Sequence, residues 1–160
     1  MHAEGKQHPL ESVLTREVQC SERLLECLEA ERSALTKRDM DGLETSINNK
    51  IEYTQSLEQL ERERESLVSE LGFASDADGL RLCFNSLPQA DNLKRLWQQL
   101  IANIEACRSS NLTNGGILES GRQHVEQALS ILRGQSGSPS LYDTRGSHAA
   151  NLGQRELGKV

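Results

Sequence analysis

Aromatic and β-branched residues are scarce in this chain of 160 residues. Aromatic side chains make up 3% of it, and valine and isoleucine together number 11 against 24 leucines. Leucine keeps its rotamer freedom in a helix, whereas β-branched and aromatic side chains favour strands. The composition therefore predicts an all-helical protein. So few aromatic residues also argue against a compact enzyme with a deep apolar pocket.

Proline is almost as scarce, with three residues at positions 9, 88 and 139. Because proline disrupts the interior of a helix, these positions predict boundaries between elements. The chain has no run of about 18 apolar residues, so we expect no membrane-spanning helix. Its first residues lack the apolar core of a secretory signal. The four cysteines form no C-x-x-C pair, which predicts reduced thiols and a cytoplasmic protein.

The net charge of −6 is unevenly distributed. Residues 10–72 carry a net charge of −7, whereas residues 91–133 carry +1. A mostly acidic surface repels the phosphates of nucleic acids and of anionic lipids. We therefore expect no nucleic-acid partner.

Apolar residues recur at helical spacing in three stretches. They predict helices at about 10–37, 41–71 and 91–133, with a corner around residues 39–44 and an irregular loop at 72–90. The expected fold is an antiparallel bundle of three long helices with coiled-coil-like packing. Residues 1–9 and 134–160 are expected to be flexible, because the tail is rich in Gly, Ser and Asn and too polar to form a core.

The third stretch has the clearest pattern. Its seam positions alternate four and three apart over about six heptads, which predicts a long helix with a coiled-coil-like seam. They are Leu93, Trp97, Leu100, Ile104, Cys107, Asn111, Asn114, Leu118, Gly121, Val125, Ala128 and Leu132. Asn111 and Asn114 either fix the register as buried polar residues or face water on a locally bent helix.

This helix is longer than either of the first two, so a hairpin of shorter helices cannot cover all of it. Two arrangements are open for its apolar C-terminal part, residues 117–132. It overhangs the hairpin and needs another partner, or a kink near Gly115-Gly116 folds it back.

The sequence contains no convincing catalytic, metal-binding or cofactor-binding set. Cys20 and Cys27 share a helix face but lack the further ligands of a zinc site, so we interpret them as buried thiols. His124 lacks neighbours that would hold a phosphoryl group. Gly115-Gly116 follows no strand and precedes no Lys-Ser/Thr, so no phosphate loop is predicted. In the tail, Leu141-Tyr142 is either a short docking segment or a chance pair.

Three segments resemble the FlgN family of flagellar export chaperones. Residues 111–119 match Asn-x-x-Asn-Gly-x-x-Leu-Glu, residues 127–132 match Gln-Ala-Leu-x-x-Leu, and residues 139–146 match Pro-x-Leu-Tyr-x-x-x-Gly. The matches follow the family's order and spacing. Over residues 10–110 the resemblance is limited to the helical pattern and a tryptophan at position 97.

The resemblance implies a binding protein and no enzyme or cofactor. FlgN proteins hold the hook–filament junction proteins FlgK and FlgL through the C-terminal regions of those proteins before export. The matching substrate-binding residues here are Ile117, Leu118, Val125, Ala128, Leu129 and Leu132. Docking to the export gate protein FlhA is implied for Leu141, Tyr142 and Gly146, although Asp143-Thr144-Arg145 is more charged than the family's usual turn.

The expected function is therefore a cytoplasmic chaperone that binds FlgK and FlgL, prevents their aggregation and delivers them to the gate. A structural coiled-coil adaptor that dimerises through the same seam is the alternative, and weak self-association is left open. A histidine phosphotransfer bundle would require phosphoryl uptake at His124.

Overall fold

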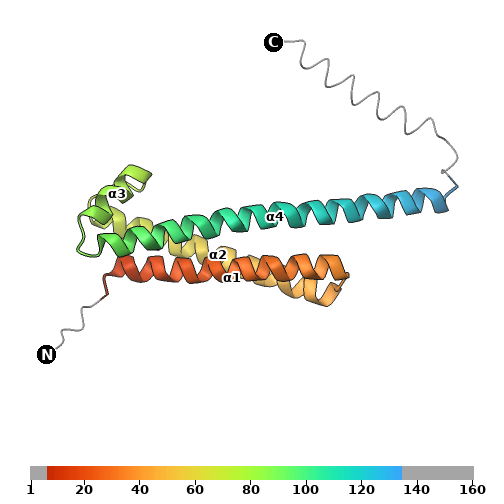
Figure 1. The fold of residues 1–160 in the computed structure, drawn as a ribbon, viewed down its shortest axis with the longest axis horizontal. Helices are drawn as coiled ribbons and strands as arrows, with labels where there is room; N and C mark the ends of the chain where they lie inside the picture. Colours follow the sequence, from red (N-terminus) through yellow and green to blue (C-terminus); the bar gives the residue numbers. More distant parts are fainter. Residues whose placement is uncertain (1–6, 135–160) are drawn as a thin grey trace, which may run out of the picture. The chain divides into compact units, whose positions relative to one another are not determined.

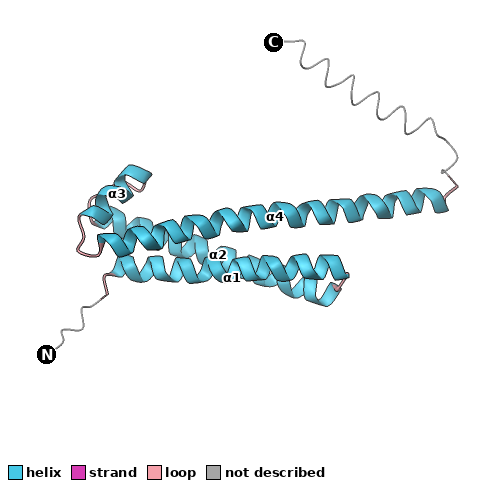
Figure 2. Cartoon of the chain, in the orientation of Figure 1, coloured by secondary structure: helices cyan, strands magenta, loops and turns pink. Residues whose placement is uncertain are grey.

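The computed structural model describes residues 7–134, which form four α-helices (Figure 1). They are α1 (Pro9–Lys37), α2 (Met40–Glu70), α3 (Ala77–Asn85) and α4 (Ala90–Leu132). Figure 2 shows these helices joined by short loops, without a strand in the described part of the chain. The all-α prediction is confirmed, and the predicted count of three helices is wrong. The chain divides into two compact units after Leu118, and α4 contributes residues to both.

Helices α1 and α2 form a hairpin with a tight corner. Pro9 begins α1, where its missing N–H costs nothing, and the His8 side chain accepts a hydrogen bond from Leu10 N. Arg38 adopts a left-handed conformation (φ 56°) that ends the helix. Asp39 then caps α2 by accepting a hydrogen bond from Gly42 N at 3.0 Å. These local signals place the reversal of the chain within two residues.

The interval 72–90, predicted to be irregular, contains the nine-residue helix α3. Asp76 caps it through a hydrogen bond from Gly79 N at 2.7 Å. An added Cβ at Gly79 would lie 1.9 Å from Ala74 O, so this position requires glycine. Leu80 and Phe84 on the inner side of α3 are buried. So short a helix is unstable alone and gains its stability from tertiary burial, which explains why periodicity did not reveal it.

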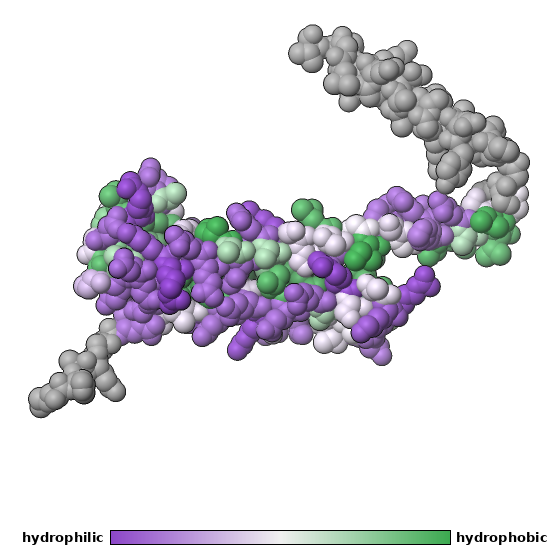
Figure 3. All heavy atoms as spheres, in the orientation of Figure 1, coloured by the Kyte–Doolittle hydropathy of each residue, from purple (hydrophilic) through white to green (hydrophobic). Residues whose placement is uncertain are grey.

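The apolar core lies where the start of α1, the end of α2, α3 and the start of α4 meet. Its buried members are Leu10, Leu14, Val18, Val68, Leu80, Cys83, Phe84, Leu93, Leu96 and Leu100. A smaller cluster follows toward the α1–α2 corner, with Leu24, Leu28 and Cys107. The core therefore thins along the bundle, and polar side chains take up the remaining inward positions. On the side of the molecule seen in Figure 3, α1 is largely hydrophilic.

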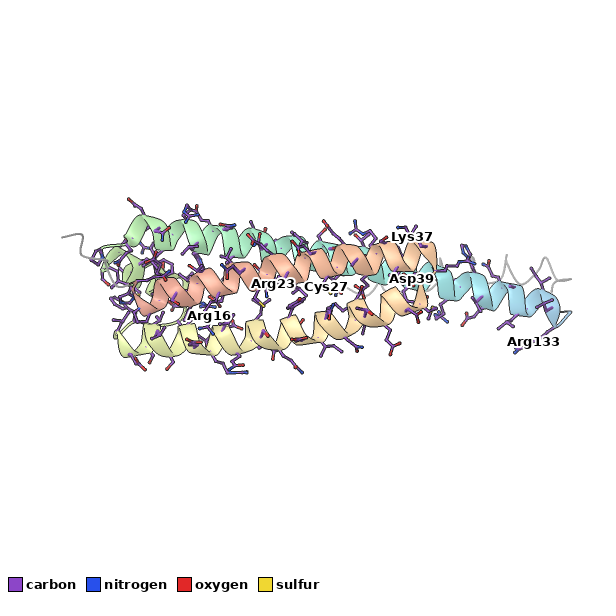
Figure 4. All side chains as sticks on the ribbon, turned by 90° about the horizontal axis from the view of Figure 1, so that it is seen from below. Arg16, Arg23, Cys27, Lys37, Asp39 and Arg133 are labelled. Carbon is purple, nitrogen blue, oxygen red and sulfur yellow. The ribbon has the colours of Figure 1, made fainter. Side chains whose placement is uncertain are left out.

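Ion pairs and a thiol connect α1 to α2. Arg16 contacts Glu63 in an exposed pair, and the Cys27 thiol donates to Ser46 O at 3.0 Å. Figure 4 shows Arg16, Arg23 and Cys27 along α1 and Lys37 and Asp39 at the corner that leads into α2. The side of α1 that holds Arg16 and Cys27 is therefore the side that faces α2.

A buried ion pair joins α1 to α2 in the thicker part of the core. Arg64 Nε donates to both carboxylate oxygens of Glu17, at 3.1 and 3.0 Å. The Arg64 guanidinium also lies over the Trp97 ring of α4, 4.8 Å from its centroid. Burial raises the pKa of the Glu17 carboxyl, and the charge and hydrogen bonds of Arg64 oppose that effect. Arg64 therefore makes contacts with two other helices at once.

Replacing Glu17 tests how far this pair supports the bundle. Glu17→Ala leaves the Arg64 guanidinium buried without its charged partner, and we expect the free energy of unfolding to fall by about 3 kcal/mol in urea denaturation. Glu63→Ala removes the exposed pair with Arg16 and serves as the control, with an expected loss below about 1 kcal/mol. Equal losses in the two variants would contradict a structural role specific to the buried pair.

Candidate functional site

The last buried residue of α4 is Asn114, which is 3% exposed. Its Nδ2 donates to Leu28 O at 2.8 Å and to Glu31 Oε2 at 2.9 Å. Its Oδ1 accepts a hydrogen bond from Arg32 Nε at 3.3 Å. All three partners belong to α1, so this amide is satisfied only when α4 lies against α1 in one register.

The carboxylate of Glu31 extends this contact into a network of three helices. Glu31 Oε1 accepts from Lys50 Nζ of α2 at 2.7 Å, and Lys50 also donates to Asn111 Oδ1 at 3.5 Å. On the other side of Asn114, Arg32 donates to Ser110 Oγ at 3.1 Å. The network replaces apolar packing at this level of the first unit, and it holds α4 to both helices of the hairpin.

The two asparagines predicted in the seam have different environments. Asn114 is buried and Asn111 is exposed, while Ser110 takes the buried position beside it. Ser110 and Asn114 lie four residues apart, which keeps them on one face of the helix. The structure therefore places one of the two predicted register residues inside the bundle.

Beyond Asn114 the predicted substrate-binding residues are mostly exposed. In the first unit, Ile117 is half-buried and Leu118 is 60% exposed. In the second unit, Val125 is 59% and Leu132 is 82% exposed, and Ala128 and Leu129 are exposed as well. Leu118, Val125 and Leu132 recur every seven residues, which places them on one face of α4. We call Leu118, Val125, Ala128, Leu129 and Leu132 the α4 stripe.

The α-helix continues through Gly115 and Gly116. An added Cβ at either glycine would meet nothing within 4 Å, so close packing does not account for the absence of a side chain there. Each glycine in a helix interior costs about 1 kcal/mol relative to alanine. The helix therefore has low intrinsic stability at Gly115 and Gly116, directly after the buried network.

Local ion pairs support the helix of the second unit. Arg122 contacts Glu119 at 2.8 Å and also pairs with Glu126, three residues before and four residues after it. The hydrogen bond from Arg122 lowers the pKa of the Glu119 carboxyl. Every residue from 119 to 134 is exposed except Ser130, which is half-buried. This segment therefore keeps its helical form without a core of its own.

The described residues give no support to metal binding, thiol chemistry or a membrane-spanning helix. No group of three or more His, Cys, Asp or Glu in the described part could hold a metal ion. Burial raises the pKa of all four cysteine thiols, which disfavours the reactive thiolate, and His124 is exposed. None of the helices within residues 7–134 combines the length and the apolarity needed to span a bilayer. The predicted docking residues Leu141, Tyr142 and Gly146 lie outside the described residues.

Sequence reasoning missed the buried polar residues of α1. Glu17, Ser21 and Glu31 lie among Leu10, Leu14, Leu24 and Leu28 in an unbroken four-three alternation along α1. Extending the heptad rule to polar residues would have placed them on the buried face. Lys50, which pairs with Glu31, and Arg64, which pairs with Glu17, carry no such signal, because long basic side chains are normally solvated.

Asn114 and Asn111 form a matched pair for testing the network. Asn114→Ala removes the hydrogen bonds to Leu28 O and Glu31, and we expect the free energy of unfolding to fall by about 2 kcal/mol in urea denaturation. Asn111→Ala changes helix propensity equally but removes only a long, exposed contact, so a change within about 0.5 kcal/mol is expected. A loss as large in Asn111→Ala would show that helix propensity, and not the network, causes the effect.

Two comparisons relate the chain to known proteins, one through its sequence and one through its fold. The family model described as "FlgN protein" matches residues 1–150. The structure is similar to a crystal structure from Pseudomonas aeruginosa, provisionally described as a flagella synthesis protein FlgN. The TM-score is 0.65 and the sequence identity 26%, over 70% of this chain and 88% of that chain. No curated protein matches the chain. Because the family model covers nearly its whole length, the chain belongs to the FlgN family.

Proposed function

We propose that this protein is a cytoplasmic flagellar export chaperone. In this proposal it binds the C-terminal regions of the hook–filament junction proteins FlgK and FlgL, prevents their premature aggregation and assembly, and delivers them to the type III export gate protein FlhA. Membership of the FlgN family supports the proposal, as does the description of the similar Pseudomonas aeruginosa protein as a flagella synthesis protein.

The single observation that carries the proposal is the exposed α4 stripe. The buried residues of α4 end at Asn114, yet apolar side chains continue at heptad spacing to Leu132. An amphipathic helix with an exposed apolar face is a common surface for pairing with a partner helix or binding in its groove. Several large apolar side chains exposed on one face of a helix are typical of a binding site. The stripe would shield the amphipathic C-terminal region of an export substrate.

Charge favours α4 over the hairpin as the helix that receives an acidic substrate segment. Residues 10–72 carry a net charge of −7, and residues 91–133 carry +1. A substrate segment with acidic residues would be directed toward α4 and away from the hairpin. Electrostatic complementarity of this kind contributes more to orientation and association rate than to affinity.

We assign delivery of the substrate to the export gate to the segment at residues 139–146. Leu141, Tyr142 and Gly146 match the family's docking segment, and Leu141-Tyr142 is an apolar-aromatic pair in an otherwise polar stretch of sequence. Since the sequence contains no phosphate loop, release of the substrate would follow from its transfer to the export machinery and not from nucleotide hydrolysis.

Truncating the stripe tests substrate binding. In the triple variant Leu118→Ala, Val125→Ala, Leu132→Ala, we expect the affinity for the C-terminal regions of FlgK and FlgL to fall about 100-fold or more, because buried apolar contacts dominate such interfaces. Isothermal titration calorimetry measures the affinity, and circular dichroism checks that the helix content is kept.

The control is Ile131→Ala, which removes an apolar side chain of the same helix with 61% exposure. Ile131 lies roughly 120° around the helix from Val125, so its truncation should leave binding unchanged. Equal binding by the triple variant and the wild type would place the substrate site elsewhere. A tight dimer in sedimentation, combined with no binding of FlgK or FlgL, would favour the coiled-coil adaptor.

Delivery is tested separately by Tyr142→Ala. This variant should bind FlgK and FlgL with unchanged affinity, because the stripe is intact, but it should export them several-fold less in a secretion assay. Ser140→Ala, which alters the same segment without removing an aromatic ring, is the control. Normal secretion by Tyr142→Ala would mean that the Leu141-Tyr142 pair occurs by chance.

A further inference from the structure

Helix α4 is held to the rest of the first unit in two different ways along its length. Its start packs into the larger apolar cluster through three buried leucines, Leu93, Leu96 and Leu100. Ile104 is half-buried against the same cluster. Between residues 105 and 114, the buried apolar residue of α4 is Cys107, in the small cluster with Leu24 and Leu28 of α1. This stretch is therefore the more weakly held part of α4, because large apolar side chains contribute more stability on burial than hydrogen bonds do.

Polar groups of α1 meet α4 where the larger cluster ends. Ser21 Oγ accepts a hydrogen bond from Asn103 Nδ2 at 2.9 Å, and Ser21 O accepts one from the Cys107 thiol at 3.7 Å. Ser21 Oγ also donates to Val18 O within α1 at 2.7 Å, and that bond does not involve α4. Water can replace the two contacts with α4 when the helices separate.

Four hydrogen bonds lie at the end of the contact between α1 and α4, and we call them the latch. Asn114 Nδ2 donates to Leu28 O and to Glu31 Oε2. Arg32 donates to Asn114 Oδ1 and to Ser110 Oγ. No residue of α4 after Asn114 is buried, so the latch is the last buried contact between the two helices.

The hairpin keeps its charges paired when the latch is broken. Glu31 Oε1 accepts from Lys50 Nζ of α2 at 2.7 Å, and that ion pair lies within the hairpin. Arg32 is half-buried in the closed bundle and gains water when α4 moves away. Withdrawal of the neutral Asn114 amide therefore leaves no unpaired charge inside the protein, which keeps the energetic cost of a local opening low.

We propose that the latch opens while the rest of the bundle stays folded. Helix α4 then leaves α1 from about residue 105 onward, and its start remains on the larger cluster. The opening uncovers Cys107 together with Leu24 and Leu28 of α1. It also frees about 14 Å of α4 directly before Leu118, the first residue of the α4 stripe. The latch thus controls how much of α4 the hairpin covers, and it does so whether or not the proposed function is correct.

Alkylation of Cys107 measures the opening in the full chain. Iodoacetamide reaches this residue, which is 6% exposed, only when α4 leaves α1 or when the whole protein unfolds. Peptide mass spectrometry reads the rate at each cysteine, and division by the rate in the urea-unfolded chain normalises it. Urea denaturation followed by circular dichroism gives the globally unfolded fraction. We expect Cys107 to react about 1,000-fold faster than that fraction allows, with little dependence on low concentrations of urea, because opening exposes little surface.

Cys27 is the matched control within the same molecule. It is 7% exposed and belongs to the same end of the bundle, but its thiol donates to Ser46 O of α2 at 3.0 Å. Departure of α4 leaves that contact in place, so Cys27 should react about tenfold or more slowly than Cys107. Equal normalised rates at the two cysteines would mean that this whole end of the bundle opens, and would overturn the latch.

Two further variants separate local opening from global unfolding. Asn114→Ala removes three of the four hydrogen bonds of the latch and should raise the Cys107 rate about tenfold or more, whereas Asn111→Ala should leave it within about twofold. Glu17→Ala breaks the buried pair with Arg64, away from the latch. It should raise the globally unfolded fraction but change the Cys107 rate by less than about twofold.

Two other results would overturn the inference. A wild-type Cys107 rate no higher than the globally unfolded fraction allows would mean that α4 leaves α1 only when the bundle unfolds. Equal acceleration of Cys107 labelling by Glu17→Ala and by Asn114→Ala would lead to the same conclusion. All of these rates are measured without an export substrate, so failure of the latch and failure of the proposed function are distinguishable.

Discussion

The hydrogen bonds from the Asn114 amide to Leu28 O and Glu31 are the constraint on which the rest of the structure depends. A buried polar group must find its partners in one geometry, whereas apolar side chains tolerate small shifts. The amide therefore binds α4 to α1 in the observed register, at the last buried position of α4. Within the described residues, no buried position follows Asn114 on α4, and the α4 stripe beyond it is exposed.

The first unit has few apolar residues for its core, and polar residues fill some of its inward positions. Glu17, Ser21 and Glu31 occupy inward positions of α1 that leucine could have filled, and each has a partner on another helix or on its own. Replacing buried ion pairs by apolar residues is often neutral or stabilising, so stability alone does not explain them. These polar groups join helices in defined pairs, Glu17 with Arg64 of α2 and Glu31 with Lys50 of α2 and Asn114 of α4.

Much of the fold could be predicted from the sequence, because long helices have strong periodic patterns. The α-helical class, the three long helices and the four-three alternation of α4 were predictable from leucine spacing and from proline positions. Helix α3 was not, because nine residues contain too few repeats, and its stability depends on burying Leu80 and Phe84. In the candidate site, the heptad spacing of Leu118, Val125 and Leu132 was visible in the sequence, but their exposure was only one of the two arrangements that the sequence left open.

The sequence by itself determined which residues share a helix face, where each long helix begins and ends, and the family to which the chain belongs. These properties depend on local spacing, capping and motif order, all of which act over a few residues. Only the tertiary structure decided that Asn114 is buried and Asn111 exposed, and that Arg64 reaches both Glu17 and Trp97. The reason is physical: burial and hydrogen bonding depend on neighbours more than 40 residues away, which no local pattern encodes.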